Sequence, residues 1–387
     1  MRLKKIPLLA QIIAAIAFGV LCGTIFPEWL SRIFATFNAL FSNILSFVIP
    51  LIILGLIAPA IADVGKKAGK LLVATATIAY VFTIFSGFFS YGVCEALYPM
   101  LISGESLNHV ESESTSLAPY FTIEMPPLFG VMSALVTSFI LGVGMTAIKG
   151  NALKNAMDDF RAIVMLSIEK IIIPFLPLYI FGIFLAITVS GQIASIFAVF
   201  IKIIILIFLI ACAILLLQYS IAGAVSGKNP LKMLKNMLVA YFTALGTQSS
   251  AATIPVTLAQ TKKNDIRDEI ADFVIPLCAT IHLSGSTLKI VACAIAIMML
   301  NGMQYDLATM TAFILMLGVT MVAAPGVPGG AIMASLGVLE SILGFDQTAL
   351  GLMIALYIAM DSFGTATNVT GDGAIAAIID KYEKSNK

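Results

Sequence analysis

Charged residues are scarce in this chain: only 11% of its 387 residues are Asp, Glu, Lys or Arg, whereas soluble globular proteins have about 25%. Hydrophobic residues make up 60%. The formal net charge is +1, and no basic run is interleaved with aromatic residues, which argues against a nucleic-acid partner. Redox, ATP-binding and nucleotide-binding signatures are also missing. The sequence therefore predicts a polytopic membrane protein that is not an enzyme and has no cofactor.

Neither the cysteines nor the N-terminus indicates a special site. The N-terminal residues Arg2, Lys4 and Lys5 precede an apolar run that ends at Phe26. This run is long enough to span a bilayer and has no small-residue cleavage site, so we interpret it as a first helix rather than a signal peptide. The five cysteines lie in apolar runs without metal-ligand spacing and are typical of reduced core residues: Cys22, Cys94, Cys212, Cys278 and Cys293.

Long apolar segments predict eight membrane-spanning helices, with two further segments that contain a polar or Gly/Pro break. Segment 229–261 has lysines at both ends, and segment 307–344 has no Lys or Arg at either end. Because positive residues concentrate in cytoplasmic loops, each segment should enter the membrane and return on the same side, one from inside and one from outside. The predicted helices are near 7–27, 36–62, 70–98, 125–148, 161–189, 193–225, 270–300 and 346–380.

A polar stripe marks the last of these helices. Four residues, Asp361, Thr365, Asn368 and Asp372, follow one another at i, i+4, i+7 and i+11 and so share one helix face. Ionisable groups at that depth are costly and normally face a partner, a cavity or a permeating solute. A buried pair neutralised by a nearby base is the structural alternative. Similar interruptions, at 282–286 and 368–372, each follow a broken hairpin, which predicts inverted repeats around a transport site.

Three motifs resemble the dicarboxylate/amino acid:cation symporter family, which includes the glutamate transporters. They are Gln248-Ser-Ser-Ala-Ala-Thr-Ile-Pro255, Pro325-Gly-Val-Pro-Gly329 and Asn-Val-Thr-Gly-Asp at 368–372. The resemblance implies an all-α protein with eight transmembrane helices and two re-entrant hairpins, a homotrimer and an elevator mechanism. It divides the chain into scaffold helices 1–2 (1–69), transport-domain helix 3 (70–98), an extracellular loop (99–120), scaffold helices 4–5 (121–190) and the rest of the transport domain (191–387).

The polar residues fit this function chemically. Asp361 can bind the ammonium of an α-amino acid, which is the role the resemblance implies for it. Asn368, the Ser250 hydroxyl and N–H groups at the broken tips can donate to its carboxylate. Hard oxygen ligands for sodium are available at Asn368 and Asp372. The predicted substrate-binding set is Ser249, Ser250, Ser286, Gly326, Val327, Pro328, Gly329, Asp361, Gly364, Thr365 and Asn368; the predicted cation-binding set is His282, Ser284, Asn368 and Asp372.

Departures from the family pattern narrow the substrate. Acidic-substrate members have an arginine where this chain has Gly364, and Gln248 stands where some relatives have another arginine. A second substrate carboxylate would be buried without a bidentate partner, and Gly364 should leave free volume, so the sequence favours a neutral amino acid. In the alternative, His282 or Lys289 replaces the arginine; otherwise Lys289 is structural and snorkels or pairs with a carboxylate.

The coupling ion is less clearly indicated. The usual Asn-Met-Asp-Gly-Thr motif of the family reads His282-Leu-Ser-Gly-Ser286 here and lacks an aspartate that helps to hold a buried sodium. We favour sodium as the coupled cation, with protons through His282 as the alternative. The sequence thus predicts a symporter that imports a neutral amino acid, in the cell (inner) membrane, with both termini cytoplasmic.

Two functions of other classes compete with this hypothesis. An intramembrane aspartyl protease needs two carboxylates that share one water, but Asp361 and Asp372 are about 16 Å apart on one helix. A passive anion or solute channel would favour repeated rings of pore-lining residues over two asymmetric, hinged tips. The channel is therefore the competing function that an experiment has to exclude.

Overall fold

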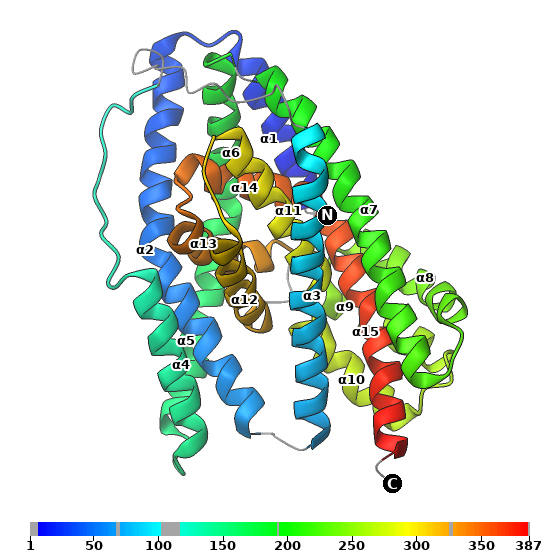
Figure 1. Ribbon diagram of the computed structural model, residues 1–387. Coiled ribbons are helices and arrows are strands. Elements are labelled where there is room, and N and C mark those ends of the chain that lie inside the picture. Colours follow the sequence, from blue (N-terminus) through cyan, green and yellow to red (C-terminus); the bar gives the residue numbers. More distant parts are fainter. Residues whose placement is uncertain (1–6, 67–69, 102–116, 192, 325–327, 386–387) are drawn as a thin grey trace, which may run out of the picture.

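The computed structural model describes residues 7–66, 70–101, 117–191, 193–324 and 328–385. This part of the chain is almost entirely helical and contains no strand (Figure 1). Most of the predicted loop 99–120 lies outside the described residues, as do the basic residues of the N-terminus. The all-α prediction is confirmed for the described ranges.

Helices from the N-terminal half pack on one another. They form two sets of contacts, in which α1 runs along α6 and α2 packs with α4 and α5. A short π-helical turn joins α5 to α6, so that Ala152–Val189 is one long apolar span that begins nine residues before the predicted helix. The bounds are α1 (Leu8–Gly23), α2 (Glu28–Lys66), α4 (Val131–Ala147), α5 (Ala152–Ser167), η1 (Ile168–Ile172) and α6 (Ile173–Val189).

A second group of helices packs around the last helix of the chain. Helix α15 contacts α7, α8, α9, α10 and α11, and α3 runs along α11. Each predicted re-entrant segment consists of two helices packed against each other: α8 with α9, and α12 with α13. In Figure 1, the second pair lies between α2 and α3. The bounds are α3 (Lys70–Leu101), α7 (Ile193–Ser226), α8 (Pro230–Thr247), α9 (Ser250–Lys262), α12 (Leu307–Ala323) and α13 (Gly330–Leu343).

The sequence explains where these helix pairs turn. Gln248 adopts a left-handed conformation, with φ of 53°, and ends α8. The next residue, Ser249, caps α9 by accepting a hydrogen bond from the backbone N–H of Ala252. In the other pair, Gly329 precedes α13 with φ of 75°, a conformation that glycine adopts without steric cost. The polar and Gly/Pro breaks in the sequence therefore coincide with turns.

Two helices of the second group are broken. The first consists of α10 (Asp268–Ile281) and α11 (Ser284–Leu300), with the break at His282 and Leu283 as predicted. The second consists of α14 (Gln347–Ala359) and α15 (Asp361–Ser385), which bend by 62°.

The position of the second break corrects the prediction. Residues 368–372, predicted to interrupt the last helix, are helical, and the break lies at Met360. The polar side chains at 368 and 372 bond sideways to α11 and His282, so they leave the backbone ladder of α15 intact. At the break itself, the carbonyl groups of Tyr357 and Met360 accept from the side chain of Lys289 in addition to backbone N–H groups.

Five helices in the described part of the chain are long and apolar enough to cross a membrane, and the bent pair α14 and α15 makes a sixth span. Helices α1 and α4 are apolar but have only 16 and 17 residues, fewer than the roughly 20 that a span usually needs. The chain is thus a multi-pass helical membrane protein, and the count of eight spans stays a prediction.

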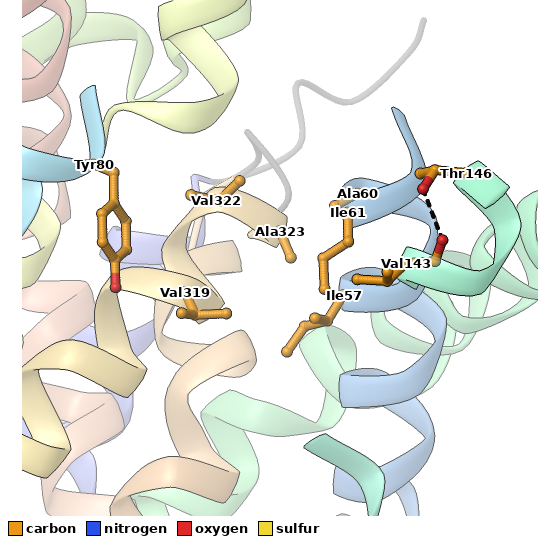
Figure 2. Close-up of a pocket in the computed structure, with 9 residues that line it drawn as sticks. All are labelled: Ile57, Ala60, Ile61, Tyr80, Val143, Thr146, Val319, Val322 and Ala323. Carbon is orange, nitrogen blue, oxygen red and sulfur yellow. Dashed lines mark hydrogen bonds between the residues drawn. The ribbon is translucent and has the colours of Figure 1, made fainter. Parts of the chain in front are cut away.

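An apolar cavity of about 350 Å³ lies between α2 and α4 on one side and α3 and α12 on the other (Figure 2). One wall comes from α2 and α4, and includes Ile57 and Val143; the other comes from α3 and α12, and includes Tyr80 and Val319. None of the predicted site residues in the described ranges lines this cavity. Its lining offers little chemistry for a polar substrate, so the candidate site has to be sought among the buried polar groups.

Candidate functional site

Asp361 is the first residue of α15 and is only 5% exposed. Both oxygens of its carboxylate have partners. The Lys289 Nζ lies 3.3 Å from Oδ1, and the backbone N–H of Gly329 donates to Oδ2 at 2.9 Å. Because Gly329 precedes α13, the carboxylate also faces the positive end of that helix dipole. The structure thus brings the second helix pair, the break before α15 and α11 together at one side chain.

Lys289 projects from α11 and is completely buried. Besides Asp361, its ammonium donates to the carbonyl oxygens of Met360 at 3.3 Å and Tyr357 at 3.4 Å. The Tyr357 ring centroid lies 3.5 Å from Nζ, within the range of a cation–π contact. An ammonium has three N–H donors, and three oxygen acceptors surround this one. The pairing of Lys289 with a carboxylate, expected for a structural lysine, is confirmed.

Gly364 does not leave the free volume that the sequence suggested. A Cβ atom at this position would lie 2.7 Å from Lys289 Nζ and 3.1 Å from its Cε. The lysine therefore fills the space beside Gly364, and this corrects the prediction of an empty position. A larger residue at 364 would displace the ammonium from its partners.

Asn368 connects α15 to the start of α11. Its Oδ1 accepts from the backbone N–H groups of Gly285, at 2.7 Å, and Ser286, at 3.3 Å. These are among the first N–H groups of α11, which have no partner within their own helix. Its Nδ2 donates to Ser286 Oγ at 3.1 Å, and the Tyr357 hydroxyl donates to the same oxygen at 3.0 Å. Asn368, Ser286 and Asp361 are therefore linked through Tyr357 and Lys289.

One helical turn beyond Asn368, Asp372 pairs with His282. The His282 Nδ1 lies 2.9 Å from Asp372 Oδ1, and both side chains are buried. The other ring nitrogen, Nε2, has no hydrogen-bond partner among the described residues, and the same holds for the Ser284 hydroxyl. His282, at the break before α11, thus meets Asp372, which lies within the continuous helix α15.

The other predicted site residues in the described ranges lie on α9, on α15 or at the turn before α13. Ser250 is the buried first residue of α9, which packs against α15. Thr365 is buried on α15, one turn after Asp361. Ser249 is half-buried at the N-terminus of α9, and Pro328 is half-buried beside Gly329. Gly326 and Val327 lie outside the described residues.

Sequence reasoning missed two polar residues at these clusters. Tyr357 supplies a ring face, a hydroxyl and a carbonyl group to the Lys289 and Asn368 cluster. Gln218, in α7, lies beside His282: a Cβ on Gly371 would be 2.6 Å from Gln218 Oε1 and 2.7 Å from His282 Cε1. Its buried amide has no hydrogen-bond partner within the described part of the chain. The signal for both was a polar side chain in an otherwise apolar run.

Comparisons with known proteins identify a family of transporters. A family model described as the sodium:dicarboxylate symporter family matches residues 8–382. The serine/threonine transporter SstT of Acinetobacter baumannii (strain AYE) is 25% identical over 405 residues, covering 99% of this chain and 98% of the relative. Mouse excitatory amino acid transporter 5 is 33% identical over 156 residues, which is 40% of this chain and 28% of the relative. Rat neutral amino acid transporter B(0) is 30% identical over 161 residues, or 41% of this chain and 29% of the relative.

Proposed function

The chain belongs to the sodium:dicarboxylate symporter family, and from this premise we propose that it imports a neutral α-amino acid driven by a sodium gradient. Symport of an amino acid with a cation follows from the family and its relatives. The neutral side chain, the choice of sodium and the elevator mechanism are the finer parts of the proposal.

The observation that carries the neutral specificity is the pairing of Lys289 with Asp361. The two charges cancel, and the three donors of the ammonium are directed at Asp361, Met360 and Tyr357. A substrate with a second carboxylate would bury one more negative charge beside donors that already have acceptors, at a cost of several kcal/mol. A zwitterionic amino acid adds no net charge to the site.

A neutral amino acid has partners in the same cluster. A carboxylate oxygen has two lone pairs, so Asp361 can accept from the substrate ammonium in addition to its present partners. Asn368 uses one of its two Nδ2 donors on Ser286, and the other can bind the substrate carboxylate. Among the relatives, the serine/threonine transporter and the neutral amino acid transporter B(0) are named for substrates of this kind.

An acidic substrate is the second candidate, because Lys289 lies against Gly364, where acidic-substrate members have arginine. Uptake by the purified protein in liposomes separates the two candidates. With serine, threonine, alanine, aspartate, glutamate and succinate offered under an inward sodium gradient, we expect uptake of neutral amino acids. Uptake of aspartate, glutamate or succinate alone would reject the neutral specificity.

The amine-binding role of Asp361 has its own test. Asp361→Asn should abolish amino acid binding, because it removes a carboxylate acceptor for the substrate ammonium and leaves Lys289 as an unpaired buried charge beside it. Asp158→Asn is a matched control: this carboxylate pairs with Lys154 near a surface and is 44% exposed. Unchanged affinity in Asp361→Asn would reject the role of Asp361.

For the coupled ion, we propose a sodium site at Asn368 and Asp372. The Ser284 hydroxyl, which has no partner among the described residues, is a further oxygen of the kind that sodium prefers. The same liposomes test this with separate sodium and proton gradients. Uptake that needs sodium and is indifferent to a protonophore and to external pH supports the proposal; uptake driven by a proton gradient alone in sodium-free buffer contradicts it.

We further propose an elevator movement, in which the helices packed around α15 slide against the group formed by α1, α2, α4, α5 and α6. The two groups pack mainly within themselves, and the apolar cavity between α2/α4 and α3/α12 lies along their boundary (Figure 2). The cavity walls are mostly apolar, and polar contacts across the boundary involve Gln347 of α14, whose carbonyl oxygen accepts from the Tyr179 hydroxyl and whose side chain donates to Ser46. A sliding movement would have to exchange these contacts. Accumulation of substrate above its external concentration distinguishes this carrier from a passive channel, and native mass spectrometry tests the proposed homotrimer.

A further inference from the structure

The break between α14 and α15 brings together oxygen atoms of the kind that bind cations. Where a membrane helix is interrupted, carbonyl groups there are less fully satisfied than inside a helix, and lipid supplies no partner. Here the Tyr357 carbonyl accepts from the Met360 N–H, and the Met360 carbonyl accepts from the N–H groups of Phe363 and Gly364. Each carbonyl oxygen can also accept from a cation. In transporters, such carbonyl-rich half-helix ends coordinate the transported cation. Here two carbonyl oxygens, of Tyr357 and Met360, converge with one carboxylate oxygen of Asp361 on a single point.

That point is occupied by the side-chain ammonium of Lys289. Its Nζ lies 3.3–3.4 Å from the three oxygens and 3.5 Å from the Tyr357 ring centroid. The side chain is 0% exposed. A methyl group added at Gly364 would already lie within 2.7 Å of Nζ. No room is left there for a second cation while the ammonium is in place.

We propose that Lys289 is a positioning residue that serves as a permanent, chain-borne cation at this break, so that the site at Tyr357, Met360 and Asp361 takes no transported ion. The inference rests on the proposed function, because it concerns how many ions accompany the substrate. In this proposal Lys289 replaces a dissociable ion. Its ammonium neutralises Asp361 and connects the end of α14 to α11 by hydrogen bonds. The coupled sodium then binds only elsewhere.

Without the lysine, the site at Tyr357, Met360 and Asp361 should need a cation from solution. In Lys289→Ala, we expect amino acid binding in low-salt buffer to fall by about 100-fold or more, because Asp361 is left as an unpaired buried charge. Methylammonium carries the missing head group and should restore binding. The sodium dependence of binding, plotted on logarithmic axes, should become steeper by about one ion than in the wild type.

Two controls separate this role from a packing role. Lys202→Met removes another lysine of an apolar helix, one that donates to the Leu101 carbonyl, and should leave the ion dependence unchanged. The double variant Lys289→Met/Asp361→Asn removes both charges. Its melting temperature in detergent should lie above that of Lys289→Met alone, because no unpaired charge remains.

Each outcome of these binding and melting experiments either supports or overturns the proposal. Restoration of Lys289→Ala by methylammonium, in substrate binding or in melting temperature, supports the proposal, and so does the steeper sodium dependence. If Lys289→Ala binds substrate with the ion dependence of the wild type and does not respond to methylammonium, the proposal is overturned. If the variant is unstable, a double variant no more stable than Lys289→Met overturns it as well. Wild-type protein that fails to take up any neutral amino acid refutes instead the proposed function.

Discussion

The contact between α11 and α15 depends on the absence of a side chain at Gly285. A Cβ atom there would overlap the carbonyl oxygen of Gly364 and would lie 2.6 Å from Thr367 Cβ. The oxygen belongs to the backbone, so the two helices would have to separate by about 1 Å to reach ordinary contact. We therefore expect Gly285→Ala to destabilise the protein and to disturb the site.

The size of this effect follows from the contacts that would be lost. Overpacking costs about 1–3 kcal/mol. Separation of the helices also stretches the hydrogen bonds from Gly285 and Ser286 to Asn368, worth about 1 kcal/mol each. The higher helix propensity of alanine returns about 0.5–1 kcal/mol. The net loss should be about 2–4 kcal/mol.

Thermal melting of the purified protein in detergent measures this change, with amino acid binding as the second readout. Gly92→Ala is the matched control, because Gly92 lies in α3 and a Cβ there would meet no atom within 4 Å. The control should match or slightly exceed the wild type in melting temperature. A Gly285→Ala protein that melts with the control and binds substrate normally would refute the reasoning.

Three further predictions concern residues at or near helix ends. Ser249→Ala removes the N-cap of α9 and should cost about 1 kcal/mol, which thermal melting can detect, whereas Ser249→Asp should retain the cap. Asp380→Asn should cost about 2 kcal/mol of stability, because Asp380 is buried and binds Arg267 and Lys384. The control is Glu269→Gln, which removes an exposed contact of the same arginine and should cost about 0–1 kcal/mol. Hydrogen bonds from the backbone N–H and side chain of Thr309 lower the pKa of Asp306. The ionised carboxylate therefore stabilises the fold above its ordinary pKa, and this effect is lost as the pH falls through the lowered pKa. The melting temperatures of wild type and Asp306→Ala should converge below about pH 4, and a constant difference would contradict this.

The sequence predicted the helical elements well where charge and turn residues agreed. Lysines at both ends of 229–261, and their absence around 307–344, identified the two helix pairs, because the cost of moving charge across a membrane limits the topologies. The turn at Gly329 then followed from a residue that adopts a left-handed backbone without steric cost, whereas Gln248 adopts that backbone although it is not a glycine.

The break at Met360 could not be read in the same way. No glycine or proline marks it, and it is stabilised by a side chain from another helix, Lys289, which is distant in sequence. The polar residues at 368 and 372 suggested a break, yet their side chains find partners across the helix interface and leave the backbone helical. Gly364 was misjudged for the same reason: a missing side chain implies space only if nothing else fills it.

The pairing of Lys289 with Asp361 also has an electrical consequence. A single charge that moves through a membrane potential of 100 mV exchanges about 2.3 kcal/mol with the field. Two opposite charges 3.3 Å apart move as one neutral unit, and the field does almost no net work on them. In the proposed elevator movement, in which α11 and α15 travel together, this pair would therefore add almost no voltage dependence to the movement of the unloaded protein.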